Sequence, residues 1–367
     1  MSIRSTFRFS GLLSMALLLA GCNLFESGGK KSSPEGVSGL TSSWIGQPLD
    51  SIADAHALAF REGRLYVTNR NALQPGTAVV DAATGLVVEY YPHLLQPASL
   101  AFTASGKLIV TEGSFGAEGA VSVVDPSTRR IVQSVIAFDQ DNKAVSADGV
   151  TYLFDRTQGV ITGFTGDMPG ENVVLDVQTG ANSNPYGIAF AGGKAFVPRY
   201  NQSSLLILGS PGTLNGGARD SIDLSAYAHD SANGVPRMSL VATHGNHVFV
   251  AMQRLNHQWV ANDTALVIVF DATTKAVVDT IPLTFRNPVS GAVLDGVWYL
   301  GGVAGYGDLL GGVEKINLAT RTHGGTVVTE ETLGGDLSTF TPAGTGGYAI
   351  ISVGAWPNTK NLVKKVD

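Results

Sequence analysis

The sequence predicts an all-β fold, a seven-bladed β-propeller, from three observations. A pattern of short apolar strands and glycine turns recurs roughly every 40 residues, the repeat length typical of propeller blades. Forty-five glycines against four tryptophans, with a charged fraction of 15%, indicate many tight turns between strands. Apolar spacing of helical period is hard to find beyond the N-terminal segment.

Each repeat has the same internal order. Proline or a small residue precedes an alternating strand, a glycine turn leads to an apolar strand, and a polar loop leads to a strand that ends in Asp. This order predicts four-stranded antiparallel blades with the innermost strand first. The third copy is weak and has Asp148-Gly149 as its hairpin turn. The seven copies are recognised within residues 55–81, 97–125, 148–176, 185–208, 247–271, 297–317 and 337–367.

The two ends of the repeat array predict how the ring closes. The last copy contains three strands, and residues 43–50 precede the first innermost strand without a blade of their own. We therefore expect residues 43–52 to supply the outermost strand of the last blade, which would remove a free sheet edge. Residues 43–367 would then form one propeller domain.

The N-terminus has the layout of a secretory signal over residues 1–21. Arg4 and Arg8 precede an apolar run that is shorter than the roughly 20 residues that span a bilayer. Cys22, the only cysteine of the chain, follows this segment directly. Residues 22–42 are rich in Ser, Gly and Lys, a composition typical of a flexible tether. We therefore expect an exported protein.

Charge and cysteine content narrow the function classes. Removal of residues 1–21 with their two arginines would lower the formal net charge from −6 to −8. An acidic balance argues against nucleic acid as the main partner, because that binding depends on phosphate neutralisation. Because Cys22 is the only cysteine, the chain can form no internal disulfide, and with its thiol modified the mature fold would hold no cysteine-ligated metal. We expect no cofactor and a monomer.

Two motifs carry family resemblances. Residues 66–69 read Tyr-Val-Thr-Asn, and residues 271–274 and 125–128 match an Asp-x-x-Thr turn. Over roughly residues 44–367 the chain resembles the YVTN-type seven-bladed β-propeller repeat family, which implies the propeller fold and no single activity. Leu-Ala-Gly-Cys at residues 19–22 resembles the lipobox of bacterial lipoproteins. That resemblance implies acylation of Cys22 and a lipid anchor in a membrane, and Asn23 after the cysteine implies the outer membrane.

One face of the predicted propeller collects arginines. Loops between second and third strands, and loops between blades, lie on the same face, where variable loops usually carry function. Because arginine forks bind carboxylate and phosphate, this face predicts a site for an anionic small molecule, a metal chelate or a peptide. The alternative is that these side chains brace neighbouring blades through acidic partners. Six of the twelve arginines after residue 21 map there: Arg70, Arg156, Arg199, Arg237, Arg254 and Arg286.

Aromatic residues extend this candidate face. Tyr200 follows Arg199, whereas Trp259, Tyr306 and Trp356 fall in the second-to-third-strand loops of the last three blades. Loop tryptophans offer a large stacking surface, which is common at recognition sites. Packing over a blade edge is the alternative.

Two functions follow from these patterns. The first is a lipid-tethered binding protein that uses the arginine and aromatic face to capture a small anion or a protein partner. The second is a metal-dependent, lactonase-like hydrolase with a cation in the central channel. Oxygen ligands for that cation would come from Asn69, Glu112 and Asp148, which would have to converge within about 5 Å of one point to reach the metal.

Overall fold

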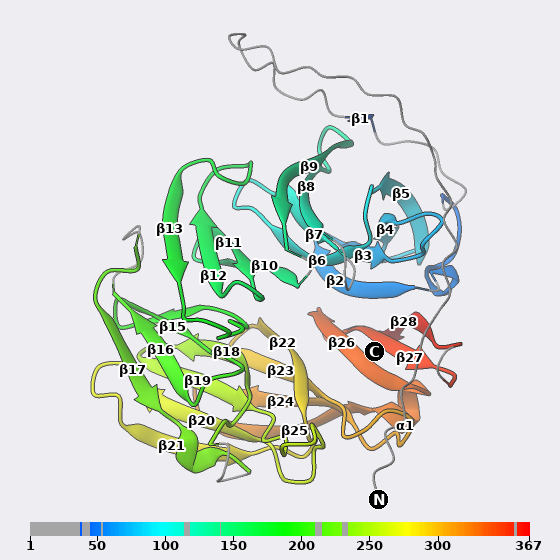
Figure 1. Cartoon of the computed structure of the whole chain (residues 1–367). Coiled ribbons are helices and arrows are strands. Elements are labelled where there is room, and N and C mark those ends of the chain that lie inside the picture. The colour runs from blue at the N-terminus through cyan, green and yellow to red at the C-terminus, as the bar shows by residue number, and fades with distance from the viewer. Residues whose placement is uncertain are drawn as a thin grey trace, which may run out of the picture. The chain divides into compact units, whose positions relative to one another are not determined.

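The strands form seven antiparallel sheets arranged around a common centre, as the blades of a β-propeller (Figure 1). The computed structural model describes residues 37–38, 45–52, 54–113, 118–139, 141–209, 215–229, 234–355 and 358–367. These residues belong to one compact unit, Gly36–Asp367. The predicted seven-bladed β-propeller is confirmed. Cys22, the predicted signal segment and Trp356 lie outside the described residues.

The first three blades each have four strands in chain order, innermost first. Blade one contains β2 (Ala55–Arg61), β3 (Arg64–Asn69), β4 (Gly76–Asp81) and β5 (Leu86–Pro92). Blade two contains β6 (Pro97–Phe102), β7 (Leu108–Glu112), β8 (Gly119–Asp125) and β9 (Arg130–Phe138), and β1 (Val37–Ser38) pairs with β9. Blade three contains β10 (Asn142–Ala147), β11 (Val150–Asp155), β12 (Val160–Phe164) and β13 (Val173–Gln178).

The remaining blades follow the same order. Blade four contains β14 (Ala189–Ala191), β15 (Lys194–Val197), β16 (Ser204–Leu208) and β17 (Arg219–Asp223). Blade five contains β18 (Met238–His244), β19 (His247–Met252), β20 (Leu266–Asp271) and β21 (Val277–Pro282). Blade six contains β22 (Pro288–Leu294), β23 (Val297–Gly302), β24 (Gly312–Asn317) and β25 (Thr322–Thr329). Blade seven contains β26 (Asp336–Ala343), β27 (Gly346–Val353) and β28 (Lys360–Val366).

Helical structure within the described residues is limited to single turns. These are η1 (Leu49–Ser51), η2 (Ser225–Tyr227) and α1 (Glu330–Leu333). Asp-x-x-Thr turns join third to fourth strands, as at Asp81, whose Oδ1 accepts the backbone N–H groups of Ala83 and Thr84 at 3.1 and 2.8 Å. This side chain replaces the backbone acceptor that a longer loop would need, so the turn stays tight.

The core consists of apolar clusters between neighbouring blades. The described residues form seven such clusters, one at each blade-to-blade interface of the ring. At the interface of blades four and five, for example, Phe196 meets Val248 and Phe270, and all three are fully buried. Each sheet therefore packs on both faces, which gives strands the continuous apolar runs seen in the sequence.

The closing segment differs from the prediction. Blade seven has three strands among the described residues, and residues 46–49 instead hydrogen-bond to β5 of blade one, with Gly46 N to Val87 O at 2.8 Å. A single parallel bridge, Asp54 to Asn361, reaches β28. Ile52 is fully buried in the cluster shared by blades one and seven, beside Ile350 and Val363. The buried side chain of Ile52 therefore joins this segment to blades one and seven, in place of the expected fourth strand.

The closure can be tested through Ile52. Ile52→Ala should lower the free energy of unfolding by about 2–5 kcal/mol, the usual cost of truncating a buried isoleucine. Ile45→Ala, in the same segment but with Ile45 42% exposed, is the matched control and should change it by about 0.5 kcal/mol or less. Urea denaturation measures both. Equal effects of the two substitutions would show that Ile52 does not hold the ring closed.

Candidate functional site

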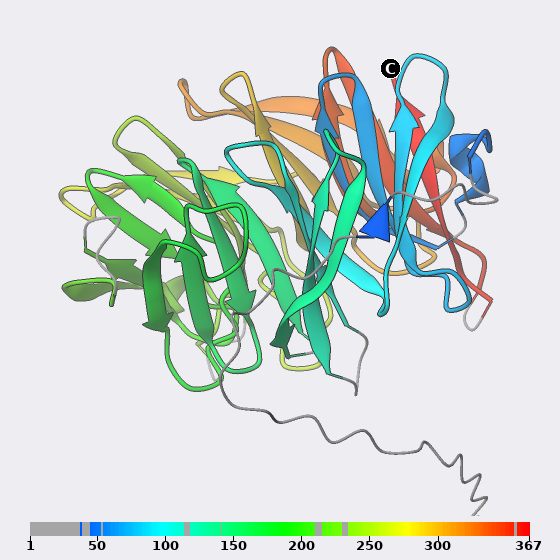
Figure 2. The same cartoon turned by 90° about the horizontal axis from the view of Figure 1, so that it is seen from above.

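The innermost strands enclose a central cavity of about 1040 Å³. All seven blades line it, six through β2, β6, β10, β18, β22 and β26 and the fourth through Tyr186, which precedes β14. Seen from the edge of the ring, the strands run between two faces (Figure 2). In such blades the second strands end, and the innermost strands begin, at the same face. Arg70 follows β3, Arg156 follows β11 and Lys143 is the second residue of β10, so their cationic groups gather at one end of the cavity.

We call Arg70, Lys143 and Arg156 the cationic mouth. Asp141 is the one carboxylate among the described residues that line the cavity, and its Oδ1 lies 2.6 Å from Arg156 Nη1. Arg70 donates hydrogen bonds to Gln96 Oε1 and Gly113 O, both at 3.3 Å. Lys143 Nζ donates to Tyr186 O at 3.2 Å. Three cations face one carboxylate here, in a chain whose net charge is −6.

Burial and the arginine charges of the mouth both act on its titratable groups. Burial, together with the charge of Arg156, lowers the pKa of Lys143 to about 8. His56 lines the same cavity and is exposed to it, yet burial inside the ring and the charge of Arg70 lower its pKa to about 4. Both shifts mean that the protonated, positively charged form of each side chain is disfavoured. An anion bound here would reduce this free-energy cost of protonation.

Three aromatic rings lead outward from the mouth. Tyr186 stacks on Tyr200 with ring centres 4.8 Å apart, and Tyr200 stacks on Trp259 at 6.1 Å with the planes only 11° apart. The Arg156 guanidinium lies 4.0 Å from the centre of the Tyr186 ring, and that of Arg237 lies 4.1 Å from the Trp259 ring. We call these five side chains the aromatic ladder. Cation–π contacts at both ends hold it in place.

The loop that carries Trp259 has an unusual backbone. Trp259 and Arg254 have φ of 64° and 54°, and Arg237, in the neighbouring loop before β18, has φ of 59°. Bulky residues rarely adopt this left-handed region, which costs about 1–2 kcal/mol each. Asn256 stabilises the turn because its Oδ1 accepts the N–H groups of Gln258 and Val260, both at 2.9 Å. The indole is thereby held in a fixed direction.

The structure separates other predicted arginines from the cavity. Arg199 donates to Ser204 O and Thr179 O at 3.2 and 2.9 Å, and so braces strands of blades three and four. Arg254 forms a 2.6 Å ion pair with Asp263. Arg286 is exposed and donates to Ala261 O at 3.3 Å. Of these three, only Arg254 has an acidic partner, and that partner lies in the same loop of blade five, whereas Arg199 and Arg286 contact carbonyl oxygens.

Tyr306 does lie at the cavity, and it is 82% exposed. It is one of several large apolar side chains that project from loops of this face. The five most exposed of that kind among the described residues are Leu73, Leu94, Trp259, Tyr306 and Leu310, and all belong to second-to-third-strand or inter-blade loops.

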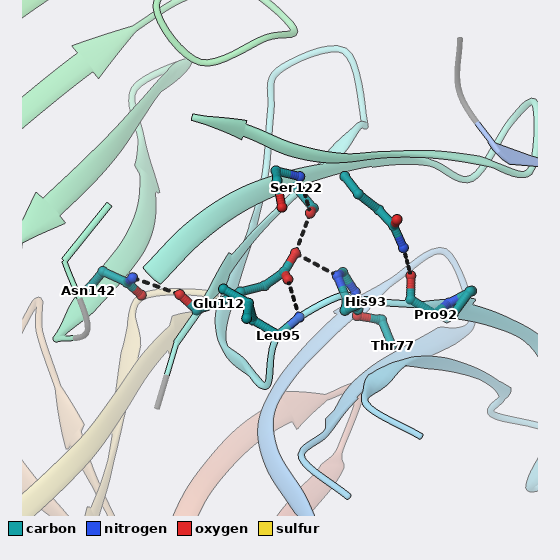
Figure 3. A network of polar contacts seen from close by, with 9 residues as sticks. Thr77, Pro92, His93, Leu95, Glu112, Ser122 and Asn142 are labelled. Carbon is teal, nitrogen blue, oxygen red and sulfur yellow. Dashed lines mark hydrogen bonds and ion pairs between the residues drawn. The ribbon is translucent and has the colours of Figure 1, made fainter. Parts of the chain in front are cut away.

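Glu112 points away from the cavity and into the interface of blades one and two. Its carboxylate meets His93 Nδ1 at 2.9 Å, the backbone N–H of Leu95 at 3.0 Å and the hydroxyl of Ser122 (Figure 3). His93 Nε2 in turn pairs with Thr77 Oγ1 at 2.9 Å. Burial alone would raise the pKa of Glu112, but hydrogen bonds from His93, Ser122 and Leu95 outweigh it and leave the pKa below its ordinary value. This network is a structural connection between two blades.

The three predicted metal ligands therefore do not converge. Asn69 Nδ2 lies 3.2 Å from Tyr90 Oη inside blade one, and Asp148 sits in the exposed β10–β11 turn, at the opposite end of a second strand. Within the described part of the chain, no group of three or more His, Cys, Asp or Glu side chains is placed to hold a metal ion. The same residues include no helix long and apolar enough to cross a membrane.

Lys143 is the site residue that sequence reasoning missed. The third repeat was too weak to locate its innermost strand, which the structure begins at Asn142. Lys143 is the second residue of β10, as Ala98 is of β6. That position could be recognised only once the strand itself had been located.

No protein-family model matches the sequence, and no curated protein matches it. Solved structures share the fold. The WD40 β-propeller domain of Doa1 is similar with a TM-score of 0.55 and 11% identity, over 90% of this chain and 97% of that one. The computationally designed protein Ika8 gives 0.53 and 13%, over 84% and 83%. A candidate 6-phosphogluconolactonase from Bacteroides uniformis gives 0.53 and 16%, over 74% and 83%. At such identities the likeness shows the β-propeller alone.

The Glu112 network makes a stability prediction. Glu112→Gln should lower the free energy of unfolding by about 1–3 kcal/mol at pH 7, because an amide cannot replace the buried carboxylate that accepts hydrogen bonds from Ser122, Leu95 and the His93 ring. Because the pKa of Glu112 is lower in the fold than its ordinary value of 4.5, the ionised carboxylate stabilises the fold at pH values above 4.5. This contribution to stability is lost as the pH falls through the lower pKa of the folded state. The wild-type advantage should therefore shrink in acid. Urea titrations at pH 7, 4 and 3 measure this.

The control for this experiment is Glu118→Gln, since Glu118 is exposed in the same blade. It should leave stability within about 0.5 kcal/mol of wild type. If the difference in free energy of unfolding between Glu112→Gln and wild type stays constant from pH 7 to 3, ionised Glu112 does not stabilise the fold as predicted.

Proposed function

We propose that this chain is a lipid-tethered β-propeller binding protein that captures an anionic small molecule at the cationic mouth. The observation that carries the proposal is the charge balance of the central cavity, where three cations face one carboxylate. The hydrogen bonds of Arg70 and Lys143 go to neutral amide and carbonyl oxygens. Both cations therefore keep charge available for a ligand. Arg70 and Lys143 are half-buried, and partly desolvated cations without anionic partners are costly, which favours a site that binds an anion.

The size and shape of the cavity fit a small ligand. At about 1040 Å³ it lies at the upper end of the range for pockets that hold cofactors and metabolites. A metal chelate that carries carboxylates would present the same anionic chemistry. The exposed apolar side chains around the mouth would suit a protein partner that delivers or receives the ligand, since such side chains are frequent at interfaces.

The membrane anchor is the second part of the proposal. It rests on Cys22 and the small residues before it, which resemble a lipobox. A tether of about 20 residues reaches on average about 25 Å, which would keep the mouth close to an outer membrane.

A lactonase-like hydrolase is the alternative. Its support is a structural neighbour described as a candidate 6-phosphogluconolactonase. The positions of Asn69, Glu112 and Asp148 give it no metal site, and the cationic mouth would repel a metal ion. Turnover of a lactone that depends on added Ca²⁺ would favour this alternative.

Anion binding should depend on the mouth. Arg70→Gln and Arg156→Gln should each raise the Kd for the anions that bind, in a panel of citrate, inorganic phosphate and glucose 6-phosphate, by about 10- to 100-fold. Arg219→Gln, on the exposed outer strand β17, is the control and should not change it. Isothermal titration calorimetry measures the constants. Equal affinities of all four proteins, or no binding by the wild type, would refute the proposal.

The anion affinity should also depend on pH through Lys143. Because its pKa is lowered to about 8, Lys143 loses its charge as pH rises through that value, and the affinity should fall between pH 7 and 9. Lys143→Arg should remove this fall, since arginine stays protonated. Titrations at pH 7, 8 and 9 at constant ionic strength measure it. A decline that persists in the Lys143→Arg protein would assign the titration to another group.

A further inference from the structure

We propose that the aromatic ladder makes this site selective for anions that carry a planar conjugated ring. The ring would stack on the exposed indole of Trp259, and the anionic group would lie against the guanidinium of Arg237. This inference rests on the proposed function, because the ladder ends at Arg156 of the cationic mouth.

The exposure of Trp259 is the first argument. Its indole is 57% exposed although it is parallel to the Tyr200 ring, so stacking surface remains free for another ring. Trp298 is a tryptophan of the core and serves for comparison. It is 2% exposed and belongs to the cluster between blades five and six. Trp259 contributes far less to any core, so packing alone does not account for its position.

The cation beside the indole is the second argument. Arg237 Cζ lies 4.1 Å from the Trp259 ring centre and 5.4 Å from that of Tyr200. Its Nη1 donates to Asn201 Oδ1 at 3.0 Å, which is a neutral acceptor. The guanidinium is thus fixed over the aromatic rings with its charge uncompensated by a carboxylate among the described contacts. A ligand with a ring and an anionic group could use both surfaces at once.

The backbone is the third argument. Trp259 and Arg237 both occupy the left-handed region, at φ of 64° and 59°. The two loops that carry them are joined, because Gln253 N donates to Arg237 O and Arg254 N to Pro236 O, both at 3.0 Å. Such strain persists where surrounding contacts over-determine it, and it concentrates at ligand sites. The loops therefore hold the indole and the guanidinium in a set arrangement before any ligand arrives.

The experiment compares three ligands on one scaffold, with the full-length chain. They are 2-naphthoate, which is planar and anionic, 2-naphthamide, which is planar and neutral, and decahydro-2-naphthoate, which is anionic and not planar. We expect 2-naphthoate to bind at least tenfold more tightly than either of the others, as measured by calorimetry. Stacking on an exposed aromatic side chain is large enough to give such a factor.

Variants assign the effect to the ladder. Trp259→Leu should weaken 2-naphthoate at least tenfold and leave decahydro-2-naphthoate unchanged, whereas Trp259→Phe should restore most of the affinity. Arg237→Gln should weaken both acids and leave the amide unchanged. Arg219→Gln, on an exposed outer strand, should change none of them. Circular dichroism of the folded variants guards against a loss of structure.

The outcomes separate the inference from the proposed function. If the two acids bind equally, or if Trp259→Leu has no effect, the ladder does not select planar ligands, although anion binding at the mouth stands. If 2-naphthoate fails to bind while citrate or a phosphate does, the inference is likewise wrong. If no anion binds, both the inference and the proposed function are wrong.

Discussion

Face-to-face packing of neighbouring sheets is the constraint on which this structure depends. A propeller sheet has two apolar faces, and the closed ring of seven buries both of them in seven clusters. A strand such as β19 has no exposed position between Val248 and Met252. The middle strands therefore have almost no freedom to vary, and their ends are fixed in space. Loops at those ends are the part that can change chemistry without opening the ring.

Buried carboxylates extend this rigidity to the loops. Glu112, Glu314 and Glu330 are all nearly or fully buried. Glu112 and Glu314 accept backbone N–H groups of the segment that enters their own blade from the preceding one, and Glu330, between blades six and seven, accepts the N–H of Leu337 in β26. Glu314, for example, takes the N–H of Phe285 at 3.0 Å. These bonds satisfy donors that the turn between blades would otherwise leave unpaired in the interior. A glutamate at the face of the site can thus be structural, and the sign of its charge says nothing about the ligand.

The sequence predicted the fold well because the fold depends on repeated apolar strands and turns, which are local. It predicted the site only in part, because a site depends on where side chains point. Arg70 directly follows β3 and Arg199 lies two residues after β15, yet Arg70 reaches the cavity and Arg199 turns to Ser204. The register of the innermost strands adds to the difficulty. In β6 it shifts between Pro97 and Ser99, whereas β10 shows no shift, so Lys143 cannot be aligned by counting from its neighbours. Ring closure was likewise not local, since Ile52 finds its partners in the last blade.

The like charges of the cationic mouth destabilise the free protein, and the rigid ring keeps them together. Lys143 and Arg156 lie close enough for one to lower the pKa of the other, and burial lowers that of Lys143 further. In a flexible loop these side chains would move apart into water. Here the start of β10 and the end of β11 are adjacent residues of one sheet, with Asn142 opposite Asp155, so the two charges stay together. Such an arrangement lowers the stability of the free protein and strengthens the binding of any anion between the two side chains. The ring supplies the stability that allows it, and the ladder of rings beside it extends the same fixed geometry outward toward Trp259.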